Sequence, residues 1–352
     1  MPDEETVRVG GRAYSRRVSP LDRPVPPPVA PSSLPADLPS GLPASLPSDV
    51  PTDLPASLPP ADAPLPDAPT GEEAAERRPT LPGLSPSRAG DFLRCPLMFR
   101  FRTVDRLPEA QSAAAARGTL VHSVLEHLFE LPAVERTLAA AHTLLPEQWE
   151  ALRARTPEVD ELFDDEGALA QWLTSAQALL ATYFTLEDPT RLEPSERELF
   201  VSTDLEDGPQ LRGIVDRVDV APNGWVRVVD YKTGKSPRPG YESSALFQMR
   251  FYAYVLWRTR GVVPKRLQLE YLGDGVVVQH EPSEAEMATF EARIRSIWAG
   301  IQEAARTGDW RPRPSKLCDW CSFRDSCPSF GGTAPDVDPD AVERATGVRP
   351  AA

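Results

Sequence analysis

The segment from residue 211 to residue 235, LRGIVDRVDVAPNGWVRVVDYKTGK, limits the possible folds of this chain more than any other segment. Two apolar, β-branched runs flank Pro222-Asn223-Gly224, a sequence typical of a tight turn. The pattern therefore predicts an antiparallel β-hairpin. Because side chains at positions i and i+2 of a strand share a face, Asp230 and Lys232 are expected to point to the same side of the sheet.

The length of the turn decides where a second acid, Asp216, lies. With a three-residue loop and Gly224 in the left-handed conformation, Asp216 faces Asp230 at about 5 Å, and one cation can contact both carboxylates. A two-residue Asn-Gly turn would instead pair Asp216 with Tyr231 and turn Asp230 to the other face. The sequence leaves both registers open, and a metal site on the hairpin requires the first. Two carboxylates and a lysine at strand ends are groups that a metal-dependent phosphodiester hydrolase needs.

Proline divides the chain into regions of different character. The 352 residues include 40 prolines, and a four-residue Leu-Pro beat runs from residue 34 to residue 59. Proline removes backbone donors and forbids helix, so residues 1–83 are predicted to be a disordered Pro-rich tail, either a spacer or a docking segment. One sizeable domain is expected at 84–330, followed by a disordered tail at 331–352.

Composition narrows the class of protein. No segment is apolar enough to cross a membrane, and the acidic start MPDEE has no signal-peptide core. Four cysteines without a secretory signal indicate a cytoplasmic protein and metal binding in place of disulfides. The net charge of −14 argues against an extended nucleic-acid-coating surface but does not exclude a nuclease. One group of arginines either faces phosphates or lies on a solvated helix: Arg88, Arg94, Arg100, Arg102 and Arg106.

Hydrophobic periodicity predicts an α/β fold. A short helix is expected from Ser85-Pro86 to Cys95-Pro96, because serine before proline is typical of a helix start. Further helices are predicted at 111–131, 133–143, 146–154, 166–185, 242–259 and 283–307. Strands are predicted at 194–204, in the hairpin at 210–232, and at 265–272 and 275–281. The order of helices and strands predicts a mixed central sheet.

Two helical positions can complete a site on the hairpin. His122 has Glu126 one turn later, and a neutral imidazole can join oxygen ligands around a metal. Glu126 either orients that ring or a bound water, or lies on the surface. Gln248 and Tyr252 share a helix face at i and i+4. They can bind a phosphate or support the lysine, although Tyr252 can also be a core residue.

The cysteines form a one-plus-three pattern. Cys318, Cys321 and Cys327 read C-x2-C-x5-C, and Cys95 follows the first predicted helix. Four thiolates can hold zinc or an iron–sulfur cluster. Because zinc sites more often use two local pairs, the pattern favours a cluster that fastens the two ends of the domain together, with structural zinc as the alternative.

Together these motifs resemble the RecB-like nucleases of the PD-(D/E)XK superfamily, in the branch that carries a four-cysteine iron–sulfur cluster. That branch includes CRISPR-associated adaptation nucleases and the nuclease domains of bacterial recombination complexes. The resemblance covers about residues 84–330 and rests on motifs in the family order: Leu84–Pro96, Gly118–Glu126, Gly213–Asp219, Val229–Gly234, Gln248 with Tyr252, and the three closing cysteines.

The resemblance implies a restriction-endonuclease-like core, with a mixed sheet flanked by helices, a helical insertion and an iron–sulfur-fastened C-terminal segment. It implies that Mg²⁺ or Mn²⁺ is held by His122, Asp216, Asp230 and the Tyr231 carbonyl. Lys232 would position and activate the attacking water, with Gln248 and Tyr252 as further catalytic residues. A 4Fe–4S cluster would be held by Cys95, Cys318, Cys321 and Cys327.

The function implied is that of a metal-dependent DNA exonuclease that acts on single strands or DNA ends in repair or recombination. The alternative is a DNA-end-binding iron–sulfur module that works only inside a helicase or CRISPR adaptation complex. The acidic composition and the lack of a motor sequence suggest this second interpretation.

Overall fold

The computed structural model describes residues 4–9, 12–17, 82–238 and 243–351. Near the N-terminus, β1 (Glu4–Val9) and β2 (Arg12–Arg17) pair as an antiparallel hairpin with Val9 opposite Arg12. The sequence did not predict this hairpin. The Leu-Pro repeat of the predicted tail lies outside the described residues.

The folded domain contains a mixed six-stranded sheet. Its strands are β3 (Gly83–Leu84), β4 (Glu196–Asp204), β5 (Gln210–Val220), β6 (Val226–Lys232), β7 (Arg266–Tyr271) and β8 (Val276–His280). β4 runs antiparallel along one edge of β5. Along the other edge, β5 pairs first with β3, in parallel, and later with β6, antiparallel. β6 and β7 are parallel, and β7 and β8 are antiparallel.

This sheet has an opening beside β5. The pairing with β3 ends at Leu211 and the pairing with β6 begins at Arg217. Residues 212–216 therefore form no ladder pair with either strand, although they pair with β4 on the opposite edge, apart from Asp216. Asp216 lies at the end of this opening.

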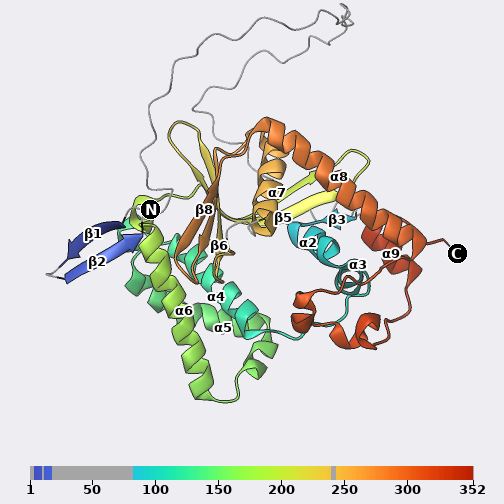
Figure 1. Cartoon of the computed structure of the whole chain (residues 1–352), viewed down its shortest axis with the longest axis horizontal. Helices are drawn as coiled ribbons and strands as arrows, with labels where there is room; N and C mark the ends of the chain where they lie inside the picture. Colours follow the sequence, from blue (N-terminus) through green and yellow to red (C-terminus); the bar gives the residue numbers. More distant parts are fainter. Residues whose placement is uncertain (1–3, 10–11, 18–81, 239–242, 352) are drawn as a thin grey trace, which may run out of the picture. The chain divides into compact units, whose positions relative to one another are not determined.

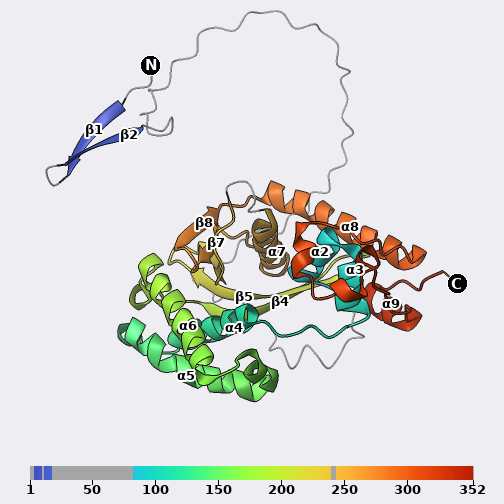
Figure 2. The ribbon, with the colours of Figure 1, turned by 60° about the horizontal axis from the view of Figure 1, so that its bottom comes forward.

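Helices cover both faces of the sheet (Figure 1, Figure 2). α4 (Ala113–Leu128), α5 (Leu138–Arg155) and α6 (Glu166–Leu186) lie on one face, and α2 (Pro86–Arg94), α7 (Ser243–Arg260) and α8 (Glu284–Thr307) on the other. Because strand side chains alternate, β6 contributes to two cores. Val226 and Val228 pack with α7 and α8, whereas Val229 and Tyr231 pack with α4 and α6.

The structure confirms the α/β class and most of the predicted elements. α2 begins as its sequence predicts: the Ser85 hydroxyl accepts from the Arg88 amide at 3.3 Å, and Pro86 occupies the first helical position. The predicted boundaries of α4, α6, α7, α8 and the strands β4 to β8 lie within a few residues of those observed. None of the described helices is both long and apolar enough to cross a membrane.

One difference concerns Pro146. The two helices predicted at 133–143 and 146–154 are mainly one continuous helix, α5, with Pro146 inside it. Proline removes one helical hydrogen bond, but Leu145 and Trp149 beside it are buried in the core on the α4–α6 face. Burial of these side chains outweighs the local preference for a break.

A second difference concerns the C-terminal residues. The sequence predicted a disordered tail at 331–352, whereas Pro339–Thr346 form helix α9 and Val342 is fully buried. The Arg100 side chain, from the π-helical turn η2 (Arg100–Val104), also donates to the Pro335 carbonyl. A single apolar stripe on a short polar helix is enough to dock this segment.

Candidate active site

The turn of the central hairpin has the three-residue form. The Ala221 amide donates to the Trp225 carbonyl at 2.9 Å, and Gly224 adopts a φ of 79°. Arg217 pairs with Val229, so Asp216 and Asp230 occupy opposing positions one step beyond the ladder. The predicted register is confirmed, and the two-residue turn is excluded.

Asp216 joins the hairpin to helix α4. Its Oδ2 accepts from the Tyr231 amide at 2.7 Å and lies 3.4 Å from Nδ1 of His122. The other ring nitrogen of His122 donates to the Tyr231 carbonyl at 3.0 Å. Burial lowers the pKa of His122, but the hydrogen bond to Asp216 and its charge outweigh burial and raise that pKa to about 9. Without metal the ring is therefore protonated, and a cation that binds here must displace a proton.

Glu198 is a site residue that sequence reasoning missed. On β4, Arg197 pairs with Arg217 and Leu199 with Val215, so Glu198 stands opposite Asp216 although the ladder skips that pair. Glu198 lies within strand β4 and has a positive φ of 43°, at the one position where the β4–β5 ladder skips a pair. One ligand atom each from Glu198, Asp216 and His122 lie within 4.8 Å of one another.

The environment of Glu198 disfavours its charge. Burial raises the pKa of its carboxyl, and the neighbouring Asp216 charge raises it further, to about 7. One weak signal was present in the sequence: Glu198 is a charged residue directly before the apolar run Leu199-Phe200-Val201. From that signal alone, Glu198 cannot be told from Glu196 as the site residue, because the choice depends on the register of β4 on β5.

Asp230, Lys232 and Gln248 form a second, directly adjoining cluster. Asp230 is fully buried, with Oδ2 at 2.6 Å from the Lys232 ammonium. The Gln248 amide donates to Asp230 at 2.8 Å and to the Tyr252 hydroxyl at 2.9 Å, while its carbonyl accepts from Lys232 at 2.8 Å. Gln248 therefore supports the lysine, and Tyr252 supports Gln248. Burial and the Asp216 charge raise the pKa of Asp230 to about 6, against the lowering effect of Lys232.

The donor set fits a divalent cation. Carboxylate oxygens suit Mg²⁺ and Mn²⁺, and an imidazole ligand favours Mn²⁺ of the two. Burial, and then the Asp216 charge, raise the pKa values of Glu198 and Asp230, and a bound cation would offset this penalty on the charged carboxylates. Of the four predicted ligands, the structure brings together His122, Asp216 and the Tyr231 carbonyl. The Asp230 carboxylate points to Lys232 and Gln248, and Glu198 joins the group in its stead.

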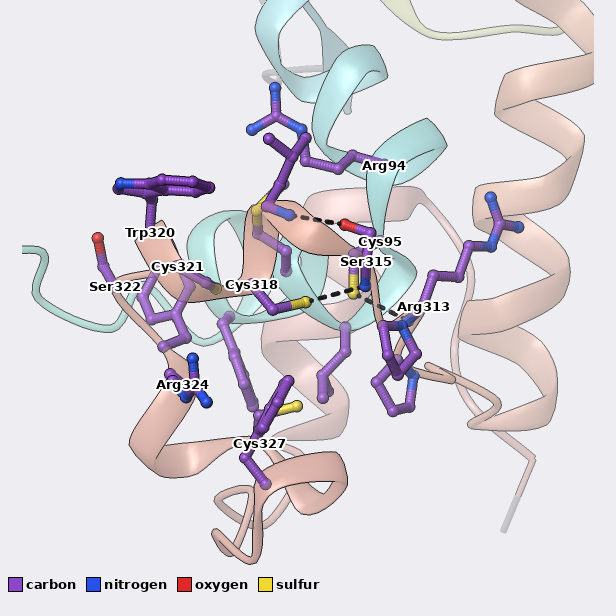
Figure 3. A pocket seen from close by; sticks show the side chains of 18 of the residues that line it. Arg94, Cys95, Arg313, Ser315, Cys318, Trp320, Cys321, Ser322, Arg324 and Cys327 are labelled. Carbon is purple, nitrogen blue, oxygen red and sulfur yellow. Dashed lines mark hydrogen bonds between the residues drawn. The ribbon is translucent and has the colours of Figure 1, made fainter.

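The four cysteines line one pocket (Figure 3). Cys95 follows α2, and Cys318, Cys321 and Cys327 come from the short turns of the C-terminal segment. None forms a disulfide. Backbone amides donate to two of the sulfurs: Arg313 to Cys95 at 3.4 Å and Ser315 to Cys318 at 3.3 Å.

The spacing of these sulfurs exceeds that of a zinc site. With Zn–S bonds of about 2.3 Å, tetrahedral thiolates lie about 3.8 Å apart. Among the described residues, no three cysteine sulfurs lie within 4.8 Å of one another. The pocket combines four free thiols, two N–H···S bonds and an apolar lining that includes Leu97, Met98 and Phe101.

The arginine group divides into two kinds. Arg100 is buried and pairs with Asp105 at 2.9 Å, and Arg102 pairs with Asp91 at 2.7 Å. Arg94, in contrast, lines an open cleft of about 770 Å³ and has no carboxylate within ion-pair distance among the described residues. The catalytic candidates Lys232, Gln248 and Tyr252 line the same cleft. The solvated-helix interpretation therefore does not apply to the buried Arg100, and Arg94 stays a candidate for contact with phosphates.

The fold and the site together define a class of enzyme. The chain belongs to the PD-(D/E)XK nuclease superfamily, whose family model matches residues 83–328. Members of this superfamily are nucleases that use divalent metals.

Individual relatives are more distant. The Gene 69 protein of Mycobacterium phage L5 is 24% identical over 291 residues, which cover 71% of this chain and 97% of that protein. The Gene 69 protein of Mycobacterium phage D29 is 27% identical over 275 residues, 71% of this chain and 98% of that protein. The crystal structure of SSO0001 matches 74% of this chain and 92% of its own at 15% identity, with a TM-score of 0.36.

Proposed function

We propose that the protein is a metal-dependent DNA exonuclease of the RecB-like branch. Its nuclease domain would comprise residues 84–330. It would act on single strands or DNA ends in repair or recombination. One observation carries the proposal: an ammonium group held by Asp230 and Gln248 adjoins a cluster of His122, Glu198 and Asp216. This is a metal site beside a fixed cation, the pair of groups that phosphodiester hydrolysis needs.

The roles of the residues follow from their contacts. His122, Asp216, Glu198 and the Tyr231 carbonyl would hold Mg²⁺ or Mn²⁺, with Asp230 at its edge. When bound, such a metal polarises a phosphate oxygen and acidifies water. The Lys232 ammonium lies 2.6 Å from Asp230, and it can orient the attacking water and stabilise charge on the phosphate. Gln248 and Tyr252 fix the ammonium in that position.

Lys232→Ala tests the assignment. Cleavage of end-labelled DNA with Mn²⁺ should fall by about 100-fold or more, because one preorganised charge is lost. Lys265→Ala is the matched control, since Lys265 pairs with Glu281 at 3.0 Å and lies outside the cleft. Circular dichroism should be unchanged in both variants. Full activity in Lys232→Ala would refute the assignment.

Linear and circular substrates distinguish the two modes of cleavage. An exonuclease degrades linear single strands but leaves circular single-stranded DNA intact, because it needs an end. We expect this result at enzyme concentrations that digest the linear form completely. Rapid cutting of the circle would contradict the exonuclease proposal while leaving the nuclease assignment in place.

The cysteines support a 4Fe–4S cluster, with zinc as the less favoured alternative. The support is the gathering of all four thiols around one pocket and the two N–H···S bonds. Four unpaired thiols also support a cytoplasmic location, where thiols stay reduced. Protein purified without oxygen should be brown and should contain about four iron and four sulfide ions per chain, as this cluster type requires. Colourless protein with stoichiometric zinc would rule the cluster out.

A dependence on a partner is the second candidate. The net charge of −14 opposes DNA binding by the isolated chain, so a helicase or CRISPR adaptation complex could deliver the strand. Cleavage that appears only when such a complex is added would support this version. Efficient cleavage by the purified chain alone would exclude it.

A further inference from the structure

The cleft beside Lys232 has an apolar wall as well as a catalytic one. Phe200 on β4 and Ile214 on β5 stand directly opposite each other, and both line the cleft. Their side chains are 47% and 49% exposed, whereas Leu199 and Val215 next to them are buried. A half-exposed aromatic and aliphatic pair in the middle of two long strands is unfavourable in water unless something covers it.

The same cleft collects cations that lack an acidic partner. Arg212 and Arg94 both line it, and among the described residues neither has a carboxylate within ion-pair distance. The Arg212 guanidinium lies over Gly83. In a chain with a net charge of −14, two unpaired arginines beside one apolar pair indicate an anionic ligand that also has an apolar part.

The distance from the apolar wall, Phe200 and Ile214, to the acids Glu198 and Asp216 limits which ligand can contact both. Phe200 is two residues from Glu198 on β4, and Ile214 is two residues from Asp216 on β5, so the wall lies within about 7 Å of the acids along each strand. This distance is comparable to the spacing of neighbouring nucleotides in an extended strand. This distance would let a strand with a phosphate at the acids reach the wall with an adjoining base, although the acids themselves line a separate small pocket beside the cleft.

We propose that Phe200 and Ile214 contact the face of an unpaired base next to the cleaved phosphate, and that Arg94 and Arg212 hold neighbouring phosphates. The inference rests on the proposed nuclease function and adds the residues that select a single strand. In a duplex each base face is covered by stacked neighbours, whereas an unpaired strand can offer a base face to an apolar surface.

Abasic substrates test this contact without any cleavage. Binding of a labelled single-stranded oligonucleotide is measured by fluorescence anisotropy in EDTA, with one abasic residue moved stepwise along the strand. For the wild-type protein, one position should weaken binding by about 5- to 100-fold, the range for loss of one base–aromatic contact. In the double variant Phe200→Ala with Ile214→Ala, the intact strand should bind about as weakly as that abasic strand, with no further loss at that position.

Two controls separate the contact from a general loss of structure. Trp225→Ala removes another exposed aromatic, at the hairpin turn outside the cleft, and should leave the abasic profile unchanged. Phe200→Leu keeps apolar surface without a ring and should give an intermediate loss. Since the wall residues are half exposed, the thermal midpoint of each variant should stay close to that of the wild type.

Three outcomes overturn the proposal. An abasic profile that is flat in the wild type, or equal in wild type and double variant, means that the wall contacts no base. Self-association that disappears in the double variant means that a second copy covers the wall. If cleavage and binding persist after either of these results, the nuclease assignment still stands. A wild-type protein that neither binds nor cuts DNA would overturn both the nuclease assignment and the base contact.

Discussion

Replacement of Glu198 by glutamine should raise stability without metal and reduce the stabilisation that metal gives. In the metal-free protein, burial and then the Asp216 charge raise the pKa of Glu198 from 4.5 to about 7. A carboxyl whose folded-state pKa exceeds its unfolded value binds more protons when folded. The stability that the protonated Glu198 carboxyl contributes is therefore complete below about pH 4.5 and is lost as pH rises through 7.

The size of the effect follows from that pKa. A rise from 4.5 to about 7 corresponds to about 3 kcal/mol. Water reaches part of the side chain and screens its charge, so about 1–2 kcal/mol is expected in practice. At pH 8 in EDTA, Glu198→Gln should therefore unfold a few degrees above the wild type. The difference should shrink towards pH 5, where both side chains are mostly uncharged.

Added Mn²⁺ should offset or reverse this difference. An amide is a weaker ligand than a carboxylate, so affinity should fall by about 10- to 100-fold, and saturating metal should stabilise the variant by about 1–3 kcal/mol less than the wild type. The thermal midpoints of wild type and variant are compared at pH 5 and pH 8, each with EDTA or with Mn²⁺. Glu130→Gln, an exposed glutamate outside the site, is the matched control. A variant that is less stable than wild type in EDTA at pH 8, or that gains as much from Mn²⁺, would refute the argument.

Three further variants test the support of the site. Gln248→Ala removes the hydrogen-bond acceptor that lies 2.8 Å from the Lys232 ammonium, so kcat should fall by about 10- to 100-fold with little change in KM. Steady-state kinetics measure both constants. An unchanged kcat would contradict the supporting role of Gln248. Gly213→Ala would place a Cβ at 2.7 Å from a ring carbon of Tyr252, and urea unfolding should show a loss of about 1–3 kcal/mol; a neutral result would mean that the ring moves freely. Arg217→Met removes the buried ion-pair partner 2.6 Å from Glu187 and leaves Arg227, 2.9 Å from that carboxylate, to hold it alone, so the same assay should show a loss of about 3 kcal/mol.

The local sequence alone was sufficient to predict the hairpin and most of the helices. Asn223-Gly224 can be recognised as a turn because glycine accepts the positive φ that the loop needs. The requirement that Asp216 face Asp230 then selected the register that the structure has. Patterns of this kind depend on residues close in sequence, so no knowledge of the tertiary structure was needed.

Glu198 and α9 depend on contacts between distant residues. Glu198 reaches the site only through the register of β4 on β5, set across a turn in which Asp207, not a glycine, has a positive φ of 52°. Its own φ of 43° is unusual for a non-glycine residue in a strand. Likewise, helix α9 packs both on α8 and on η2, whose residues lie more than two hundred positions earlier, which no local pattern reveals.

The two ends of the nuclease domain hold each other in place. The Arg313 side chain donates to the Leu93 carbonyl, its amide donates to Cys95, and Arg100 bonds to Pro335. Helix α2, which carries Arg94, is therefore held partly by residues about 220 positions later in the chain. A chain that stalls before residue 313 contains Lys232 but lacks these ties. Truncation before residue 313 should therefore loosen the placement of Arg94 in the cleft even though α2 still packs on α7 and α8.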